Sequence, residues 1–205
     1  MTASKRRSIT DRPDDCVRIG GILLACSSHN RSREDSPVLA DVDGTVAVRR
    51  AVERFASTLS EVIVVIGGHE TAVRRSLAGL DVTFVHDATG GKEGNTTAVN
   101  CGAVVGTNRG WDAAVVAPGE FAHVQPETIE RLVSAYVTDD VSIVAPLYNG
   151  AVGHPTLFDA RHFDRLATES NIHSDRQRLV ESENATAVVT DDPGVCTPAS
   201  PENNS

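Results

Sequence analysis

The stretch VRIGGILLACSSHNRSREDSPVLADVDG, from Val17 to Gly44, decides the fold predicted for this chain. An apolar run from Val17 to Ala25 changes abruptly into a polar loop with small hydroxyl residues and Arg31, and apolar residues resume at Pro37. This pattern predicts a buried strand that opens into a loop. In an open α/β sheet, the loop at the carboxyl end of the first strand is where backbone amides meet the base and phosphates of a nucleotide.

Strand and helix patterns alternate along the rest of the chain. The β-branched run EVIVVIGG is typical of a strand buried on both faces of a parallel sheet. Strands are predicted at 61–68, 81–86, 113–117, 141–147 and 185–190, with an edge strand within 148–158. Helices are predicted at 45–59, 69–80, 98–105, from Pro126 onward, at 159–168 and at 174–182. This alternation predicts the α/β class, with a doubly wound, mostly parallel sheet.

The length and composition fit one folded domain. The chain has 205 residues, of which 40% are hydrophobic, and this is enough for a sizeable core. We expect a disordered tail at 1–16, a folded domain at 17–192 and a second disordered tail at 193–205, where Pro, Ser, Asn and Thr replace apolar residues.

The charge balance excludes one large class of partners. With 28 acidic against 19 basic residues, the net charge is −9, whereas a general nucleic-acid surface needs clustered cations. Only two residues are lysines, Lys5 and Lys92. This acidic surface is similar to that of proteins from high-salt cytoplasm.

The cysteines and hydropathy point to a cytoplasmic protein. The four cysteines (Cys16, Cys26, Cys101 and Cys196) have no CxxC spacing, so free thiols in a reducing cytosol are expected. No run approaches the roughly 20 apolar residues of a membrane span. The polar, acidic sequence after Arg6 and Arg7 does not match a signal peptide, so no membrane association is expected.

Four segments carry residues suited to binding phosphates or a metal. In ACSSHNR, the small residues permit close backbone approach, and Arg31 has the geometry to clamp a phosphate; an ordinary polar loop is the alternative. In APGEF, Glu120 follows a buried strand and is a hard oxygen ligand suited to Mg²⁺; a solvated or capping carboxylate is the alternative.

The other two segments offer hydroxyl groups and a histidine. In GNTTAVN, Thr96 and Thr97 bring hydroxyls to a helix amino end, or simply cap it. In GHPTLF, His154 lies between Gly and Pro and is a candidate substrate contact, although a lone turn histidine is more often structural. The sequence contains no Walker A loop, nucleophile elbow or complete GxGxxG.

Taken in order, these segments resemble the MobA-like NTP transferase family. The resemblance covers about Val17 to Val195, and the GHP and DDPGV elements look most like the molybdenum cofactor cytidylyltransferase branch. It implies a three-layer, Rossmann-like nucleotidyltransferase fold with helices on both faces of the sheet. It also implies a nucleoside triphosphate (CTP or GTP) with Mg²⁺, transfer to a molybdopterin-type phosphate acceptor, and release of pyrophosphate.

The resemblance assigns roles to individual residues. Ala25, Cys26, Ser27 and Ser28 would line the nucleotide, and Arg31 would meet its phosphates as a catalytic cation. Asp87, Thr96 and Thr97 would lie near the base and ribose. Glu120 falls where the family places its magnesium-binding aspartate.

The signature loop is degenerate. The family pattern resembles LAAGxSxRMGxxK, whereas this chain has Ser27 for the glycine and Ser36 for the lysine, and Glu120 replaces the aspartate. Two alternatives to a molybdopterin-type transferase therefore stay open. One is a weakened or inactive nucleotide-binding or partner-binding relative, and the other is a nucleotidyltransferase that acts on a sugar phosphate or another small phosphate acceptor.

Overall fold

The computed structural model of the chain describes residues 16–26, 32, 34–87, 89, 95–168 and 184–201, with only the backbone described at 95 and 96. The predicted helix at 174–182 and nearly all of the predicted tail at 1–16 lie outside the described residues.

A mostly parallel sheet of eight strands forms the centre of the molecule. The strands are β1 (Ile19–Ala25), β4 (Glu61–Ile66), β5 (Thr83–His86), β6 (Ala113–Pro118), β7 (Ile143–Tyr148), β8 (Ala151–Val152), β9 (Thr156–Asp159) and β10 (Ala185–Val189). Their order is β10-β7-β9-β6-β1-β4-β5, and β8 pairs with β7. The pairs β1–β4, β1–β6, β4–β5 and β7–β10 are parallel, and β9 is antiparallel to both of its neighbours. A small hairpin of β2 (Asp41–Val42) and β3 (Thr45–Val46) stands apart from this sheet.

The central strands bury both faces, which is why they are apolar throughout. Along β1, Leu23 and Ala25 belong to one hydrophobic core, whereas Ile22 and Leu24 belong to the other. Successive strand residues point to opposite faces, so an unbroken apolar run supplies two cores at once.

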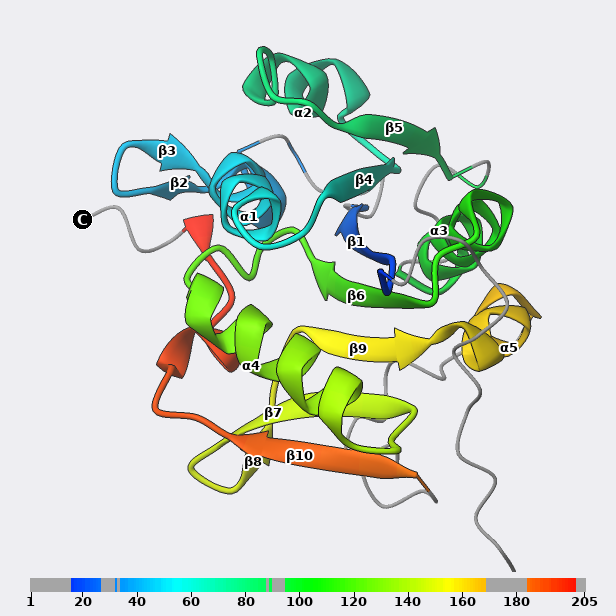
Figure 1. The fold of residues 1–205 in the computed structure, drawn as a ribbon. Helices are drawn as coiled ribbons and strands as arrows, with labels where there is room; N and C mark the ends of the chain where they lie inside the picture. Colours follow the sequence, from blue (N-terminus) through cyan, green and yellow to red (C-terminus); the bar gives the residue numbers. More distant parts are fainter. Residues whose placement is uncertain are drawn as a thin grey trace, which may run out of the picture.

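Helices cover both faces of the sheet (Figure 1). They are α1 (Ala47–Ala56), α2 (Glu70–Ser76), α3 (Asn95–Arg109), α4 (Pro126–Thr138) and α5 (Phe163–Thr168). Residues of α1, α2 and α4 belong to one core, and residues of α3 and α5 belong to the other. Helix α3 lies close to β1, because a Cβ on Gly102 would come within 2.6 Å of the Ile22 side chain. The predicted α/β fold with a three-layer arrangement is confirmed.

Two predictions about the carboxyl-terminal half are wrong. The strand expected at an edge, β9, lies between β6 and β7, and β10 occupies the edge instead. All four residues of β9 are buried, because this strand pairs with β6 on one side and with β7 on the other. The tail predicted from Pro193 is packed as far as 201: a short 3₁₀ helix spans Pro193–Val195, and the Val195 side chain is fully buried. Backbone contacts, which composition does not report, hold this segment.

Among the described helices, none combines the length and apolar character that crossing a membrane requires.

Candidate functional site

The carboxyl ends of β1 and β6 form the centre of the candidate site. The chain leaves β1 towards β4 and β5 on one side and later returns to β6 on the other, so the order of the strands reverses here. The amide of Gly119, just beyond β6, donates to the carbonyl of Leu24 in β1 at 2.9 Å. Such a switch point leaves a crevice at the ends of the strands, where ligands bind in open α/β sheets.

Cys26 lies directly after β1 at this edge. Its thiol is 3.6 Å from the carbonyl oxygen of Val65 in the neighbouring strand β4. Burial, together with the nearby Asp87, Cys101 and Glu120, raises the pKa of the Cys26 thiol to about 12. Cys26 therefore stays a neutral thiol at physiological pH, and the negative charge at this edge belongs to the carboxylates.

Asp87 follows β5, two strands away from β1, and contacts Thr89 and the first turn of α3. Its amide donates to the carbonyl of Ile66 at 2.9 Å, which continues the sheet by one residue. Its carboxylate accepts hydrogen bonds from the Thr89 amide at 3.0 Å, the Thr89 hydroxyl at 2.8 Å and the Thr97 hydroxyl at 3.1 Å. A buried carboxylate needs such donors. Asp87 thus ties the end of β5 to the first turn of α3.

Glu120 is held in the turn after β6. The Phe121 amide donates to the carbonyl of Pro118 at 3.1 Å, and the carbonyl of Glu120 itself accepts from the Ala199 amide at 2.7 Å. The ring of Phe121 packs against the ring of His154, with centroids 4.4 Å apart. His154 is itself buried, so the residue predicted to contact substrate packs beside the Glu120 turn through its ring.

The Asp192 carboxylate fastens the end of the chain beside α4. It accepts hydrogen bonds from the Gln125 amide at 2.8 Å, the Thr128 hydroxyl at 2.8 Å and the Gly194 amide at 2.9 Å. The last of these closes an Asp-Pro-Gly turn. Asp192 therefore satisfies donors at the amino end of α4 and joins that helix to the residues that follow β10.

The structure brings several of the predicted residues to one edge and leaves others undescribed. Ala25, Cys26, Asp87, Thr97 and Glu120 all follow or flank the carboxyl ends of β1, β5 and β6. Ser27, Ser28 and Arg31 lie outside the described residues, and only the backbone of Thr96 is described, within the first turn of α3.

The sequence reasoning missed two partner residues. Thr89 is one of them, and the Asp-x-Thr spacing from Asp87 is a signal for it, because such residues commonly close local turns. The other is Ala199, which contacts Glu120 through its amide alone. No side-chain pattern reports that contact.

The described residues contain no group of three or more His, Cys, Asp or Glu side chains arranged to hold a metal ion by themselves. Glu120 nevertheless offers a hard oxygen donor at the crevice. A hollow of about 320 Å³ lies beside the start of α2 and is lined by residues 69–72 and Arg75. It belongs to one short segment next to β4 and includes none of the carboxylates described above.

Comparison with known proteins identifies the family. The model of the MobA-like NTP transferase domain matches residues 21–188. The chain belongs to this family. The MobA-like domain thus covers every described element of the sheet from β4 to β9 and nearly all of β1 and β10. No match was found among curated protein sequences.

Solved structures share the fold of this MobA-like domain. Rv0371c from Mycobacterium tuberculosis H37Rv is 22% identical with a TM-score of 0.69, over 85% of this chain and 88% of that one. Rv0371c has also been solved in complex with manganese. A nucleotidyl transferase from Methanothermobacter thermautotrophicus is 21% identical with a TM-score of 0.70, over 86% and 88% of the two chains. A CMP:2-keto-3-deoxy-manno-octonic acid synthetase solved with CTP is 12% identical with a TM-score of 0.63, over 84% and 90%.

Proposed function

We propose that this protein is a metal-dependent nucleotidyltransferase that uses CTP or GTP and a molybdopterin-type phosphate acceptor. In this reaction an acceptor phosphate oxygen bonds to the α-phosphorus of the nucleotide, and the bond to the β-phosphate oxygen breaks to release pyrophosphate. The observation that carries the proposal is the convergence of Cys26, Asp87 and Glu120 at the strand ends, within a domain of the MobA-like family.

The residues at this edge of the sheet have different roles in the proposed reaction. Small residues after β1 let the nucleotide approach the backbone, and the neutral Cys26 thiol adds no charge that would repel phosphates. The Asp87 carboxylate holds the Thr97 hydroxyl in the first turn of α3, and this helix end would meet the base or ribose of the nucleotide. Nucleotidyl transfer to a phosphate needs mainly positioning of the reactants and neutralisation of their charge. Groups of these types can supply both.

The donor chemistry at Glu120 fits Mg²⁺. Mg²⁺ is commonly bound by one or two carboxylates, with phosphates and water as the remaining ligands, and this agrees with the lack of a three-residue cluster among the described residues. Glu120 would hold the ion. When bound, the ion neutralises charge on the phosphates. The manganese complex of Rv0371c supports divalent-metal use by a protein of this fold.

One observation favours a second candidate, a relative with weakened or no turnover. Ser36, at the position of the family's signature lysine, is fully buried. A serine side chain carries no positive charge that could neutralise the phosphates. In this candidate the domain binds a nucleotide or a partner without transfer.

Titration and turnover together separate these candidates. CTP, GTP and ATP are titrated calorimetrically, each with and without Mg²⁺, and pyrophosphate release is followed with molybdopterin and with sugar phosphates as acceptors. We expect magnesium-dependent binding of CTP or GTP and release with molybdopterin. Nucleotide binding without pyrophosphate release with any acceptor supports the second candidate. Pyrophosphate release with sugar phosphates alone would mean that the acceptor is a sugar phosphate and not molybdopterin. No binding of any nucleotide contradicts the transferase proposal.

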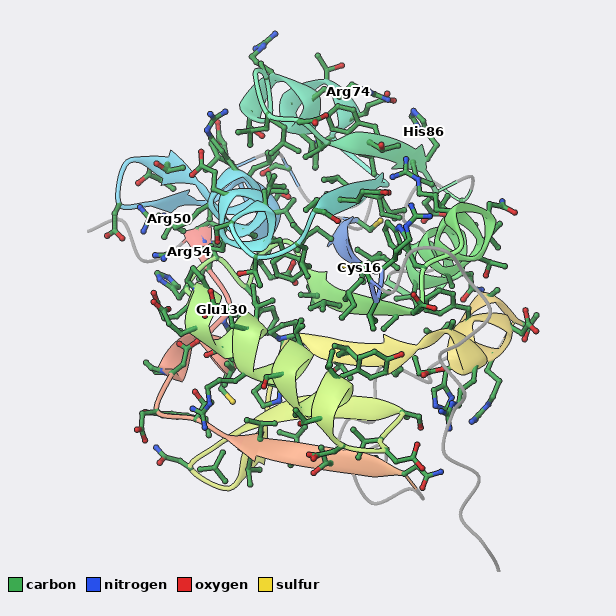
Figure 2. All side chains as sticks on the ribbon, viewed as in Figure 1. Cys16, Arg50, Arg54, Arg74, His86 and Glu130 are labelled. Carbon is green, nitrogen blue, oxygen red and sulfur yellow. The ribbon has the colours of Figure 1, made fainter. Side chains whose placement is uncertain are left out.

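The Glu120→Gln variant tests the metal role, with Glu130→Gln as the matched control. Glu130 is an exposed carboxylate on the outside of α4 (Figure 2). We expect Glu120→Gln to lower magnesium-dependent turnover by roughly 10²-fold or more, because a charge-stabilising group is lost. The control variant should keep wild-type turnover. Equal activity of both variants would remove Glu120 from the metal site.

A further inference from the structure

Residues 192–199, here called the C-terminal strap, run from the end of β10 past the first turn of α4 towards the β2–β3 hairpin (Figure 1). Along this path the strap contacts the turn at 119–125, which carries Glu120, at three separate places. Each contact involves backbone atoms of the turn, so the strap constrains the backbone conformation of the turn.

The first and second contacts lie at the far end of the turn. Asp192 accepts a hydrogen bond from the Gln125 amide at 2.8 Å. Gly194 lies directly against the backbone of His123: a Cβ at this glycine would be 2.4 Å from the carbonyl carbon and oxygen of His123 and 2.7 Å from the amide of Val124. Only glycine permits two backbones to approach so closely.

The third contact reaches Glu120 itself. The Ala199 amide donates to the Glu120 carbonyl at 2.7 Å. The Ala199 methyl group is buried in a small cluster with Ala122 and residues of the hairpin region (Ala40, Val42 and Ala47). Because most of these side chains are alanine, the strap and the turn lie close together, and any larger side chain forces them apart.

The same strap also holds the segment of His154. The His154 amide donates to the carbonyl of Val195 at 2.8 Å, and a Cβ on Gly153 would be 2.5 Å from that carbonyl oxygen. The ring of His154 packs on Phe121, next to Glu120. The Glu120 turn and the His154 segment are therefore held by one piece of chain.

We propose that the C-terminal strap positions the Glu120 carboxylate for the metal, with Gly194 and Ala199 as positioning residues. The proposal rests on the nucleotidyltransferase function given above. A metal-binding carboxylate on a turn keeps its geometry only when neighbouring groups hold the turn, and losing such support typically costs 10- to 100-fold in metal affinity, as an order of magnitude. In this chain the support comes from backbone contacts made after the last strand.

Three variants of the full-length protein test this. Gly194→Ala pushes on the His123 backbone, and Ala199→Leu overfills the alanine cluster. Cys196→Leu is the matched control, since it adds a large side chain at an exposed position of the same strap. Ala199→Ser is a milder second variant in case the leucine prevents folding. Circular dichroism and thermal melting establish that each variant is folded.

Three measurements are made on each variant, one of which is calorimetric titration of the nucleotide with and without metal. Hydrogen exchange followed by mass spectrometry reports the opening of peptide 119–125, and Mn²⁺ titration by electron paramagnetic resonance, with CTP or GTP present, reports metal affinity. We expect Gly194→Ala and Ala199→Leu to raise the exchange rate of this peptide about tenfold. We also expect them to weaken Mn²⁺ binding roughly tenfold or more, while nucleotide binding without metal stays at the wild-type level. Cys196→Leu should change neither quantity.

Other outcomes overturn the proposal. Wild-type exchange and metal affinity in both folded strap variants contradict it, and so does an equal loss of nucleotide binding with and without metal, which signals general unfolding of the site. If the wild-type protein binds no metal and no nucleotide, the transferase function fails. In that case the strap has no metal carboxylate to position, and faster exchange at 119–125 in the variants then shows only that it secures the turn.

Discussion

The Thr97 hydroxyl donates to the Asp87 carboxylate at 3.1 Å and joins the end of β5 to the first turn of α3. The same carboxylate holds both the amide and the hydroxyl of Thr89. Three donors, two from Thr89 and one from Thr97, thus converge on one buried acid. Asp87 therefore holds Thr89 and the first turn of α3 at the end of β5.

This relationship predicts that Asp87 and Thr97 act as a unit. We expect Asp87→Ala to weaken CTP or GTP binding by about tenfold or more, because Thr89 and Thr97 lose the acceptor that they share. Adding Thr97→Val should weaken binding little further, since residues in one hydrogen-bond network are not additive. Calorimetric titration of the two single variants and the double variant measures this coupling.

Thr107→Val is the control for this cycle, because the Thr107 hydroxyl donates to the Ala103 carbonyl one turn earlier in the same helix, at 3.0 Å. It should leave nucleotide affinity unchanged. Strictly additive losses from Asp87→Ala and Thr97→Val would mean that the two residues act separately.

Cys26 should resist alkylation. With its pKa raised to about 12 by burial and by neighbouring Asp87, Cys101 and Glu120, its thiolate fraction at pH 8 is very small. The thiolate is the reactive form, so iodoacetamide should modify Cys26 at least about a hundredfold more slowly than an ordinary exposed thiol. Peptide mass spectrometry, with the exposed Cys16 and Cys196 as internal references, gives the rates. Modification of Cys26 as fast as of these two would refute the assigned environment.

Glu61 should stabilise the fold at neutral pH and lose this contribution in acid. Burial alone would raise its pKa, but hydrogen bonds from Arg109 at 2.8 Å, Trp111 at 3.2 Å and Arg18 at 3.1 Å together lower it. A lowered carboxyl pKa gives stability that is present above the unfolded value, about 4.3, and is lost as pH falls through the folded value.

We therefore expect Glu61→Ala to lower the free energy of unfolding by about 1–2 kcal/mol at pH 7, since three donors lose a partly exposed partner. The difference from wild type should shrink below about pH 4. Urea unfolding at several pH values measures it, and a difference that persists unchanged in acid would contradict the ionic origin.

His162 should act in the opposite direction. Burial lowers its pKa below the ordinary value, with Arg165 and Arg161 adding to the effect and Asp159 opposing it. The unfolded chain then binds the proton more readily, so stability falls as pH drops from about 6.5 towards the folded pKa. His162→Gln can keep the hydrogen bond to the Ser142 hydroxyl, seen here at 2.9 Å, but cannot titrate. It should therefore remove the loss of stability that wild type shows as pH falls through this window. Parallel pH profiles of the two proteins would exclude this role.

Tyr136 should contribute to stability through its hydroxyl. This oxygen lies 2.9 Å from the buried carboxylate of Asp159 and 3.0 Å from the Asp112 carbonyl, which joins α4 to β9 and the start of β6. Tyr136→Phe should cost about 1–3 kcal/mol, because Asp159 keeps its burial and loses a donor. Tyr148→Phe, at a partly exposed position, is the control and should melt at the wild-type temperature. Equal melting of both variants would contradict the prediction.

The sequence by itself determined the α/β class, the strands of the parallel half and the edge of the sheet at which the candidate site lies. Apolar runs such as Ile19–Ala25 and Glu61–Ile66 indicate central parallel strands clearly, because a strand that is buried on both faces is apolar at nearly every position. The same logic placed the loop that begins at Cys26 and the turn that carries Glu120 at one edge, because parallel strands bring their carboxyl ends together, whereas Asp87 was assigned through the family resemblance.

Only the tertiary structure decided what joins distant segments through backbone atoms. The insertion of β9 between β6 and β7, the burial of Val195 and the hydrogen bond from Ala199 to Glu120 have no side-chain pattern behind them. Amides and carbonyls are the same in every residue, so their pairing depends on the path of the whole chain. For that reason the sequence predicted a disordered tail from Pro193 onward, whereas the structure shows the C-terminal strap, which contacts the turn of the candidate metal carboxylate.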